Sequence, residues 1–211
     1  MCGIAGYIDK TGKYRPEKKM VKKMTDAIIH RGPDAEGQWI DEYIALGHRR
    51  LSIIDLEAKS NQPLVSHDGK YVITFNGEIY NYIELKSELV SKGAVFRTDS
   101  DTEVVIEAYR AYGEECFNQF NGMWSLALYD MEEQKVILSR DRFGIKPAYT
   151  VDNEDVFVFA SEIKAILAAF PEENIPNEAC IYRYLSQSVN EDTDEQCFYK
   201  NIKIFPAAHY M

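Results

Sequence analysis

Long apolar runs are missing from this sequence of 211 residues. No stretch approaches the roughly 20 consecutive apolar residues that a membrane-spanning helix requires. The N-terminus also lacks the basic segment and extended apolar core that mark a secretory signal. These absences predict a cytoplasmic protein that has no membrane partner and keeps its cysteines reduced.

Basic clusters and the common ligand-binding motifs are missing as well. There are 24 Lys and Arg residues against 34 Asp and Glu, so the formal charge is −10 and no nucleic-acid partner is expected. The four cysteines and four histidines are scattered, without a C-x-x-C or H-x-x-x-H spacing, which predicts no metal site. Neither a glycine-rich phosphate loop nor a G-x-S-x-G element occurs.

The apolar pattern predicts short strands mixed with helices. Strands rich in aromatic and β-branched residues are expected at 4–8, 38–46, 71–75, 124–129, 136–138 and 156–159, with hairpin turns at 130–135 and 152–155. Helices are expected at 17–30, 83–92, 162–169, 177–186 and after Ser100, which forms a capping-box pattern with Glu103. This order favours antiparallel sheets covered by helices, in one domain with a peripheral excursion at 171–196.

Cys2 is the strongest candidate for a nucleophile. Removal of Met1 would make Cys2 the first residue, with a thiol pKa of about 8.5 and an α-amine pKa of about 7.7–8.0. One residue would then supply both nucleophile and base. His30 and His48 are therefore expected in a loop or the core, not in a Cys-His pair. Position alone would favour a cysteine without a role, so the flanking sequence decides.

Five further blocks accompany the N-terminal Met-Cys-Gly-Ile-Ala-Gly. They are His-Arg-Gly-Pro-Asp at 30–34, Arg-Leu-Ser-Ile-Ile-Asp at 50–55, Asn-Gly-Glu-Ile-Tyr-Asn at 76–81, Ser-Asp-Thr-Glu at 100–103 and Arg-Asp-Arg-Phe-Gly-Ile-Lys-Pro at 140–147. Together they resemble the class II glutamine amidotransferases, which are N-terminal-nucleophile hydrolases. The blocks at 50–55 and 76–81 are similar to the glutamine-hydrolysing asparagine synthetases. The resemblance covers nearly the whole chain.

The resemblance implies a fold and an activity. The fold is α+β, a four-layer α/β/β/α sandwich of two antiparallel sheets, with Cys2 at a strand start that opens into a cleft. The activity is hydrolysis of L-glutamine to glutamate and ammonia through a thioester on Cys2. The ammonia would serve amidation of aspartate to asparagine by a C-terminal synthetase domain.

The resemblance also bears on the rest of the enzyme. The S-G-G-x-D-S loop of the family's synthetase domain does not occur in this sequence. Residues 1–211 are therefore expected to form the glutaminase domain alone, without a cofactor, and ATP and Mg are expected only in the synthetase domain. A homodimer is left open.

Individual residues acquire roles by the same resemblance. Asn76 and Gly77 would form the oxyanion site, since a side-chain amide stands next to an unhindered N–H. Arg50 would bind the substrate α-carboxylate through its planar fork. Asp101, with Glu78, would bind the α-ammonium. Backbone groups that would line the pocket belong to Leu51, Ser52, Ile53 and Ile54.

Local patterns alone predict plainer structural roles. The Asn76-Gly77 pair is typical of a hairpin turn, and Asp101 suits the first turn of a helix. Arg49, on the face opposite to Arg50, is expected to be solvated. The Asp141-Arg142 pair is expected at an ion-paired or solvated hairpin edge.

Three alternatives to an asparagine synthetase glutaminase remain at this point. They are an amidotransferase domain for another acceptor, a catalytically silent binding or scaffold domain of the same fold, and a stand-alone hydrolase of another amide. The joint presence of Cys2, Arg50, Asn76 and Asp101 favours an active domain that binds a free amino acid.

Overall fold

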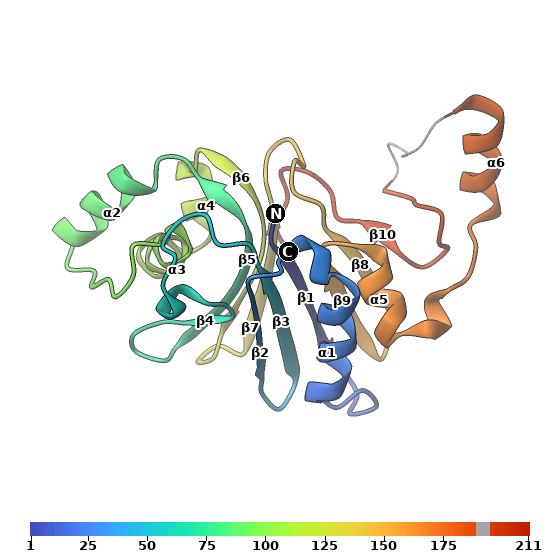
Figure 1. Cartoon of the computed structure of the whole chain (residues 1–211), viewed down its shortest axis with the longest axis horizontal. Coiled ribbons are helices and arrows are strands. Elements are labelled where there is room, and N and C mark those ends of the chain that lie inside the picture. Colours follow the sequence, from blue (N-terminus) through green and yellow to red (C-terminus); the bar gives the residue numbers. More distant parts are fainter. Residues whose placement is uncertain (189–194) are drawn as a thin grey trace.

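A computed structural model describes residues 1–188 and 195–211 of the protein. Two antiparallel sheets stack face to face, and helices cover the outer face of each (Figure 1). The predicted α+β sandwich of four layers, α/β/β/α, is therefore confirmed. Among the described residues, no helix combines the length and the apolarity needed to cross a membrane.

The six-stranded sheet has the strand order β10-β8-β9-β1-β3-β2, and the four-stranded sheet has the order β4-β5-β6-β7. The strands of the first sheet are β1 (Gly3–Asp9), β2 (Ala35–Ile40), β3 (Ile44–Arg50), β8 (Tyr149–Asp152), β9 (Val156–Ala160) and β10 (Lys203–Ile204). Those of the second sheet are β4 (Leu64–Val65), β5 (Tyr71–Ile79), β6 (Gly122–Asp130) and β7 (Lys135–Arg140).

The helices form two groups, one on each sheet. Those packed on the six-stranded sheet are α1 (Lys18–Ala27) and α5 (Ile163–Ala169), and those beside the four-stranded sheet are α2 (Tyr82–Ser91), α3 (Asp101–Tyr112) and α4 (Cys116–Gln119). Short 3-10 turns are η1 (Ile29–Arg31), η2 (Ala58–Ser60), η3 (Gly113–Glu115) and η4 (Pro171–Glu173). Helix α6 (Glu178–Gln187) projects away from the sandwich (Figure 1), as predicted for 171–196, of which 189–194 lie outside the described residues.

The inner strands are buried on both faces, which explains their nearly continuous apolar sequences. Along β1, Ile4 joins the core between the two sheets, whereas Ala5 and Tyr7 join the core beneath α1 and α5. This alternation follows from the two-residue period of a strand. The inter-sheet core also contains Leu46, which is fully buried, and Phe159. Strand β1 therefore has its first residues anchored on both sides.

Two predicted elements differ from the observed ones. The strand expected at 38–46 is instead a hairpin of β2 and β3, because the chain turns between Asp41 and Ile44, where the Asp41 N–H donates to the Ile44 carbonyl. The helix expected at 17–30 ends at Ala27, and the short 3-10 turn η1 follows it. The predicted hairpins β6–β7 and β8–β9 are confirmed.

The capping box expected at the start of α3 is only half present. The Ser100 hydroxyl accepts the N–H of Thr102, as a capping residue should. The Glu103 carboxylate, however, accepts the N–H groups of Arg97 and Thr98 in the preceding loop. Glu103 thus binds the loop before the helix instead of the Ser100 N–H, which donates to the Thr98 hydroxyl.

The expectation of a solvated Arg49 is wrong, and that of an ion-paired or solvated Asp141-Arg142 pair is wrong for Asp141, whereas Arg142 is exposed as expected. Arg49 is only 7% exposed, because its guanidinium lies between Asp26 of α1, at 2.6 Å, and Glu36 of β2, at 3.3 Å. Asp141 is fully buried and accepts backbone N–H groups, while Arg142 donates to backbone carbonyls, including that of Phe120. Both side chains organise the backbone of neighbouring segments.

Leu46 allows a test of the inter-sheet core. Truncation of a buried leucine to alanine costs about 2–5 kcal/mol, because apolar contacts are lost and a cavity remains. We expect Leu46→Ala to lower the free energy of unfolding by about this amount in urea unfolding followed by circular dichroism. Leu185→Ala, at a 76% exposed position on α6, is the control, with a change below about 0.5 kcal/mol. Equal losses in both variants would contradict the assigned core.

Candidate active site

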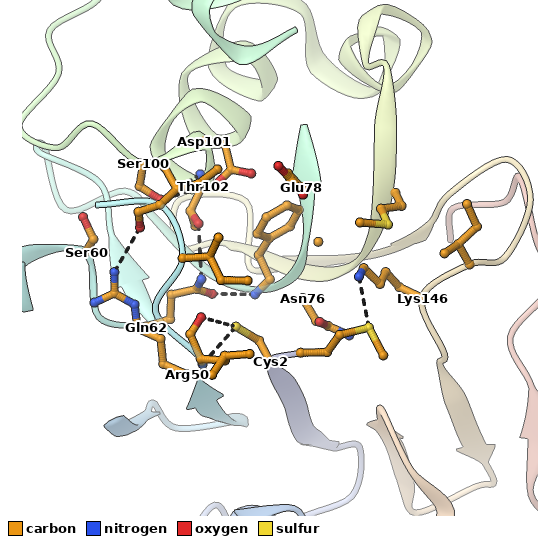
Figure 2. Close-up of a pocket in the computed structure, with 18 residues that line it drawn as sticks. Cys2, Arg50, Ser60, Gln62, Asn76, Glu78, Ser100, Asp101, Thr102 and Lys146 are labelled. Atoms are coloured by element: carbon orange, nitrogen blue, oxygen red, sulfur yellow. Dashed lines mark hydrogen bonds between the residues drawn. The ribbon is translucent and has the colours of Figure 1, made fainter. Parts of the chain in front are cut away.

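A pocket of about 350 Å³ opens beside the N-terminal end of β1. Its walls come from the chain after β3, the C-terminal half of β5 and the start of α3 (Figure 2). The predicted site residues that line it are Cys2, Arg50, Leu51, Ile53, Ile54, Asn76, Gly77, Glu78 and Asp101. The structure thus brings together residues from segments far apart in the sequence.

Ser52 is the predicted site residue that does not line this pocket. Its backbone N–H donates to the Asp34 carboxylate at 2.8 Å, which turns this part of the segment toward the loop after η1. The expectation that all four residues from 51 to 54 contribute to the wall is therefore wrong for Ser52.

Cys2 lies immediately before β1, as predicted. Its sulfur is 3.6 Å from the Leu51 carbonyl and accepts the Leu51 N–H at 3.4 Å. Burial raises the pKa of the thiol above its usual value, and the Leu51 N–H, the N-terminal ammonium of Met1 and Arg50 oppose this rise. A thiol with a raised pKa is protonated at neutral pH, so it needs a nearby base in order to act as a nucleophile.

Asn76 presents a buried amide that has no partner within the described parts of the chain. The side chain is 1% exposed, and its Nδ2 atom has no hydrogen-bond acceptor there. A buried donor that stays without an acceptor costs about 1–3 kcal/mol, so its position needs a physical reason. Figure 2 shows Asn76 between Cys2 and Lys146. The amide is therefore placed to donate to a group that arrives beside Cys2.

Gly77 adds a backbone donor at the same place. Asn76 and Gly77 are not a hairpin turn, as local sequence suggested, but lie inside β5 opposite Ser125 and Trp124 of β6. The N–H groups of Phe75 and Ile79 point away from β6, since they donate to Gln62 and Asp101. By the alternation of a strand, the Gly77 N–H points to that same edge.

The lack of a side chain at Gly77 is also required. A Cβ atom there would approach the Met123 carbonyl oxygen to 2.4 Å, far inside van der Waals contact. The close approach of β5 and β6 at this point therefore depends on glycine.

Asp101 supplies a carboxylate at the far side of the pocket. It is the first residue of α3, as predicted, and only 4% exposed. Burial raises its pKa to about 6, although N–H groups of Ile79 and Thr102 oppose this, and nearby Glu78 adds to the rise. A cation that entered this end of the pocket would restore the ionised form and would be bound in return.

Arg50 closes the opposite side of the pocket. Its guanidinium donates to the Asn61 side chain at 2.6 Å and to the carbonyls of Ile54, Asp55 and Glu57. These bonds hold the segment after β3 against the pocket. Figure 2 shows Cys2, Arg50 and Asp101 on three sides of the same space, so the pocket offers a cation and an anion at separate places.

Gln62 and Lys146 are among the residues of the pocket wall that were not predicted as site residues. Gln62 accepts the Phe75 N–H at 2.6 Å and donates to Thr102 at 3.2 Å, so it joins three walls of the pocket. Lys146 places its ammonium 3.1 Å from the sulfur of Met1. Lys146 belongs to the sequence block at 140–147, and this signal could have marked it; nothing local distinguishes Gln62.

The two histidines considered earlier have structural positions, as expected. His48 is fully buried in β3, with its Nε2 atom 3.0 Å from the Phe75 carbonyl, and burial lowers its pKa to about 4. His30 lies at the surface beside Glu162. Within residues 1–188 and 195–211, no cluster of three or more His, Cys, Asp or Glu side chains is arranged to hold a metal ion.

Several known proteins have sequences similar to that of this chain. The chain is 43% identical over 188 residues to asparagine synthetase [glutamine-hydrolyzing] 1 of Bacillus subtilis, covering 88% of this chain and 29% of that protein. It is 40% identical to a putative asparagine synthetase [glutamine-hydrolyzing] 2 of Methanocaldococcus jannaschii (85% and 38%), and 34% identical to the amidase chry2 of Gibberella zeae (100% and 32%). The chain spans about a third of the length of these relatives.

The fold is also found in a solved structure. A glutamine phosphoribosylpyrophosphate amidotransferase from B. subtilis superposes with a TM-score of 0.68 at 20% identity, over 80% of this chain and 43% of that one. This likeness concerns the fold alone. The family model described as glutamine amidotransferase domain matches residues 1–211. The chain belongs to the glutamine amidotransferase domain family.

Proposed function

We propose that this domain hydrolyses the side-chain amide of L-glutamine, with Cys2 as the nucleophile once Met1 has been removed. The observation that carries the proposal is the unpaired, buried amide of Asn76 beside the sulfur-bearing end of the pocket. A donor kept without an acceptor suits an oxyanion that exists only during reaction. Family membership and the placement of Cys2 next to Leu51 support the same reading.

The chemistry follows from the groups in the pocket. The sulfur of Cys2 attacks the side-chain carbonyl carbon of glutamine, and the thiol proton passes to the free α-amine of Cys2. The Asn76 amide and the Gly77 N–H bind the oxyanion. The C–N bond then breaks, the α-ammonium returns the proton to departing ammonia, and a glutamyl thioester remains. Water hydrolyses the thioester and releases glutamate.

Selection of a free amino acid follows from the two charged ends of the pocket. Arg50 would receive the α-carboxylate, and Asp101 with Glu78 would receive the α-ammonium. Both Arg50 and Asp101 are at least nine-tenths buried, so their charges are weakly screened by water. An amide substrate that lacks either α-group would leave one of these buried charges without a counter-charge, which disfavours hydrolysis of unrelated amides.

The use of the ammonia is proposed from the relatives. Several are named glutamine-hydrolysing asparagine synthetases, and this chain spans about a third of their length. We therefore propose that a further domain, dependent on ATP and Mg, transfers the ammonia to aspartate, whereas residues 1–211 bind no cofactor. The relative named amidase chry2 keeps open an acceptor other than aspartate.

Loss of Cys2 tests the proposed function directly. We expect protein without Met1, verified by intact mass, to release ammonia from glutamine, and Cys2→Ala to release none because the nucleophile is gone. The matched control is Cys180→Ala, at another free cysteine that lies in α6 outside the pocket. Processed protein that neither releases ammonia nor forms an adduct with an electrophilic glutamine analogue would refute a glutaminase.

Asn76→Ala tests the oxyanion site. Removal of one such donor lowers kcat about 10²–10³-fold, whereas binding of the uncharged ground-state amide changes little. We therefore expect a large fall in kcat with KM for glutamine within about threefold of wild type. Asn118→Ala, at an exposed position in α4, is the control. A kcat close to that of the control would exclude Asn76 from this role.

The raised pKa of Asp101 predicts how the affinity for glutamine depends on pH. The pKa of about 6 means that the carboxylate is largely neutral at pH 5 and charged at pH 7. Only the charged form attracts the α-ammonium, so affinity should rise about tenfold from pH 5 to pH 6.5 and level off above pH 7. Calorimetry on Cys2→Ala, which binds without turnover, measures this. The Cys2→Ala, Asp101→Asn double variant should bind weakly and evenly over this range; an unchanged slope would reject the assignment.

A further inference from the structure

Lys146 is buried in the pocket wall. The proposed mechanism assigns no role to this lysine. Its side chain is 5% exposed, and its ammonium contacts the sulfur of Met1 at 3.1 Å. Figure 2 shows Lys146 and Arg50 on opposite sides of Cys2. A lysine is rarely buried unless something nearby requires its charge. The burial of the Lys146 charge at this place therefore needs a physical reason.

The backbone around Lys146 is held from two sides. The fully buried carboxylate of Asp141 accepts the N–H groups of Phe143, Ile145 and Lys146, each at 3.0 Å. On the other side, the Arg140 guanidinium donates to the carbonyls of Gly144 at 2.7 Å and Lys146 at 2.8 Å.

The turn itself depends on Gly144, whose φ of +62° belongs to the left-handed region that favours glycine. The same Asp141 carboxylate also accepts the Trp124 N–H of β6 at 3.2 Å. The loop at 141–146 is thus tied to the sheet, and the place of the lysine is set by the fold.

The ammonium of Lys146 lies near the N-terminus without an ion pair among the described residues. The nearby Arg31 donates to the Cys2 carbonyl at 2.8 Å but is paired with Glu162 at 2.9 Å. In the described part of the chain, no carboxylate lies within 4 Å of the Lys146 ammonium. The charged groups that act on Cys2 are Arg50, Asp101 and the N-terminal ammonium, and those that act on Lys146 are Arg31, Glu78 and Asp141.

Lys146 and Cys2 influence each other electrostatically. Burial and the charge of Arg31 lower the pKa of Lys146, whereas the Cys2 thiolate opposes this lowering. Such coupling is mutual, so the ammonium must also favour the thiolate form of Cys2. A positive charge beside an α-amine likewise disfavours its protonation.

We propose that Lys146 is a positioning residue for the N-terminal nucleophile: its clamped ammonium favours both the thiolate and the free α-amine of Cys2. The inference rests on the proposed function, because it concerns Cys2 as nucleophile after Met1 has left. Lys146 keeps its own proton throughout, and the thiol proton still passes to the α-amine. What Lys146 changes is the pH at which Cys2 becomes competent.

The test compares Lys146→Met, which keeps length and removes charge, with Lys146→Arg, which keeps charge. Two quantities are measured against pH in processed protein: kcat/KM for glutamine, and the rate of Cys2 alkylation by iodoacetamide, which needs no turnover. Lys146→Met should move the acid limb of both profiles upward by about 0.5–1 pH unit, with activity at pH 7 about 3–10-fold lower. Lys146→Arg should stay near wild type, as should the exposed control Lys200→Met.

The outcomes separate this inference from the proposed function. Alkylation profiles that coincide for wild type and Lys146→Met would overturn it, and so would equal shifts in Lys146→Met and Lys146→Arg, which would indicate packing alone. If processed wild type fails to hydrolyse glutamine while the alkylation profile shifts, the glutaminase proposal fails and the effect of Lys146 on Cys2 stands. Lys146→Gln replaces Lys146→Met if thermal melting shows that the methionine variant does not fold.

Discussion

The pairing of β1 with β3 is the constraint on which the pocket depends. The register sets Gly3 opposite Arg49, so the chain just before β1 runs beside the chain just after β3. This is why the sulfur of Cys2 meets the backbone of Leu51. A slip by one residue would move every side chain of β1 to the other face of the sheet. The inter-sheet core resists such a slip, because Ile4 and Leu46 are fully buried in it.

The edge of β5 completes what this register begins. The N–H groups of Phe75, Gly77 and Ile79 all point away from β6. The Phe75 N–H donates to Gln62 and the Ile79 N–H donates to Asp101, whereas Gly77 between them lines the pocket. Beyond the two residues that pair with β4, this side of β5 is a free sheet edge, and the donors of such an edge are usually blunted or covered. Here the covering groups come from the pocket walls themselves. The hydrogen bonds on either side therefore fix the backbone at Gly77 and leave its N–H directed toward the pocket.

The sequence predicted the strands and helices well where their patterns are long, and failed where distant partners decide. The Asn76-Gly77 pair has the local signature of a turn, but pairing with β6 over nine residues of β5 overrides it. Solvation of Arg49 was a reasonable expectation because its partners, Asp26 and Glu36, lie on other elements. The hairpin of β2 and β3 was missed because only a few polar residues separate its two apolar strands.

The residues of the candidate site differ in how clearly the sequence marks them. Cys2, Arg50, Asn76 and Asp101 stood out because their motifs resemble a known family, and the structure gathers them around one pocket. Local propensity would have assigned plainer roles to most of them. Lys146 was not predicted, although it lies in the sequence block at 140–147, because its proposed role depends on the hydrogen bonds by which Asp141 and Arg140 hold its backbone.

The charge distribution in the pocket fits the proposed binding of a zwitterion by an acidic protein. The chain carries a formal charge of −10, yet the N-terminal end of the pocket holds Arg50 and Lys146, and the end at α3 holds Asp101 and Glu78. Fields from distant surface charges are screened within about 8–10 Å, so the buried groups dominate inside. A free amino acid matches this polarity with its carboxylate and ammonium. In the proposed binding mode, the side chain is the part of glutamine that reaches Cys2.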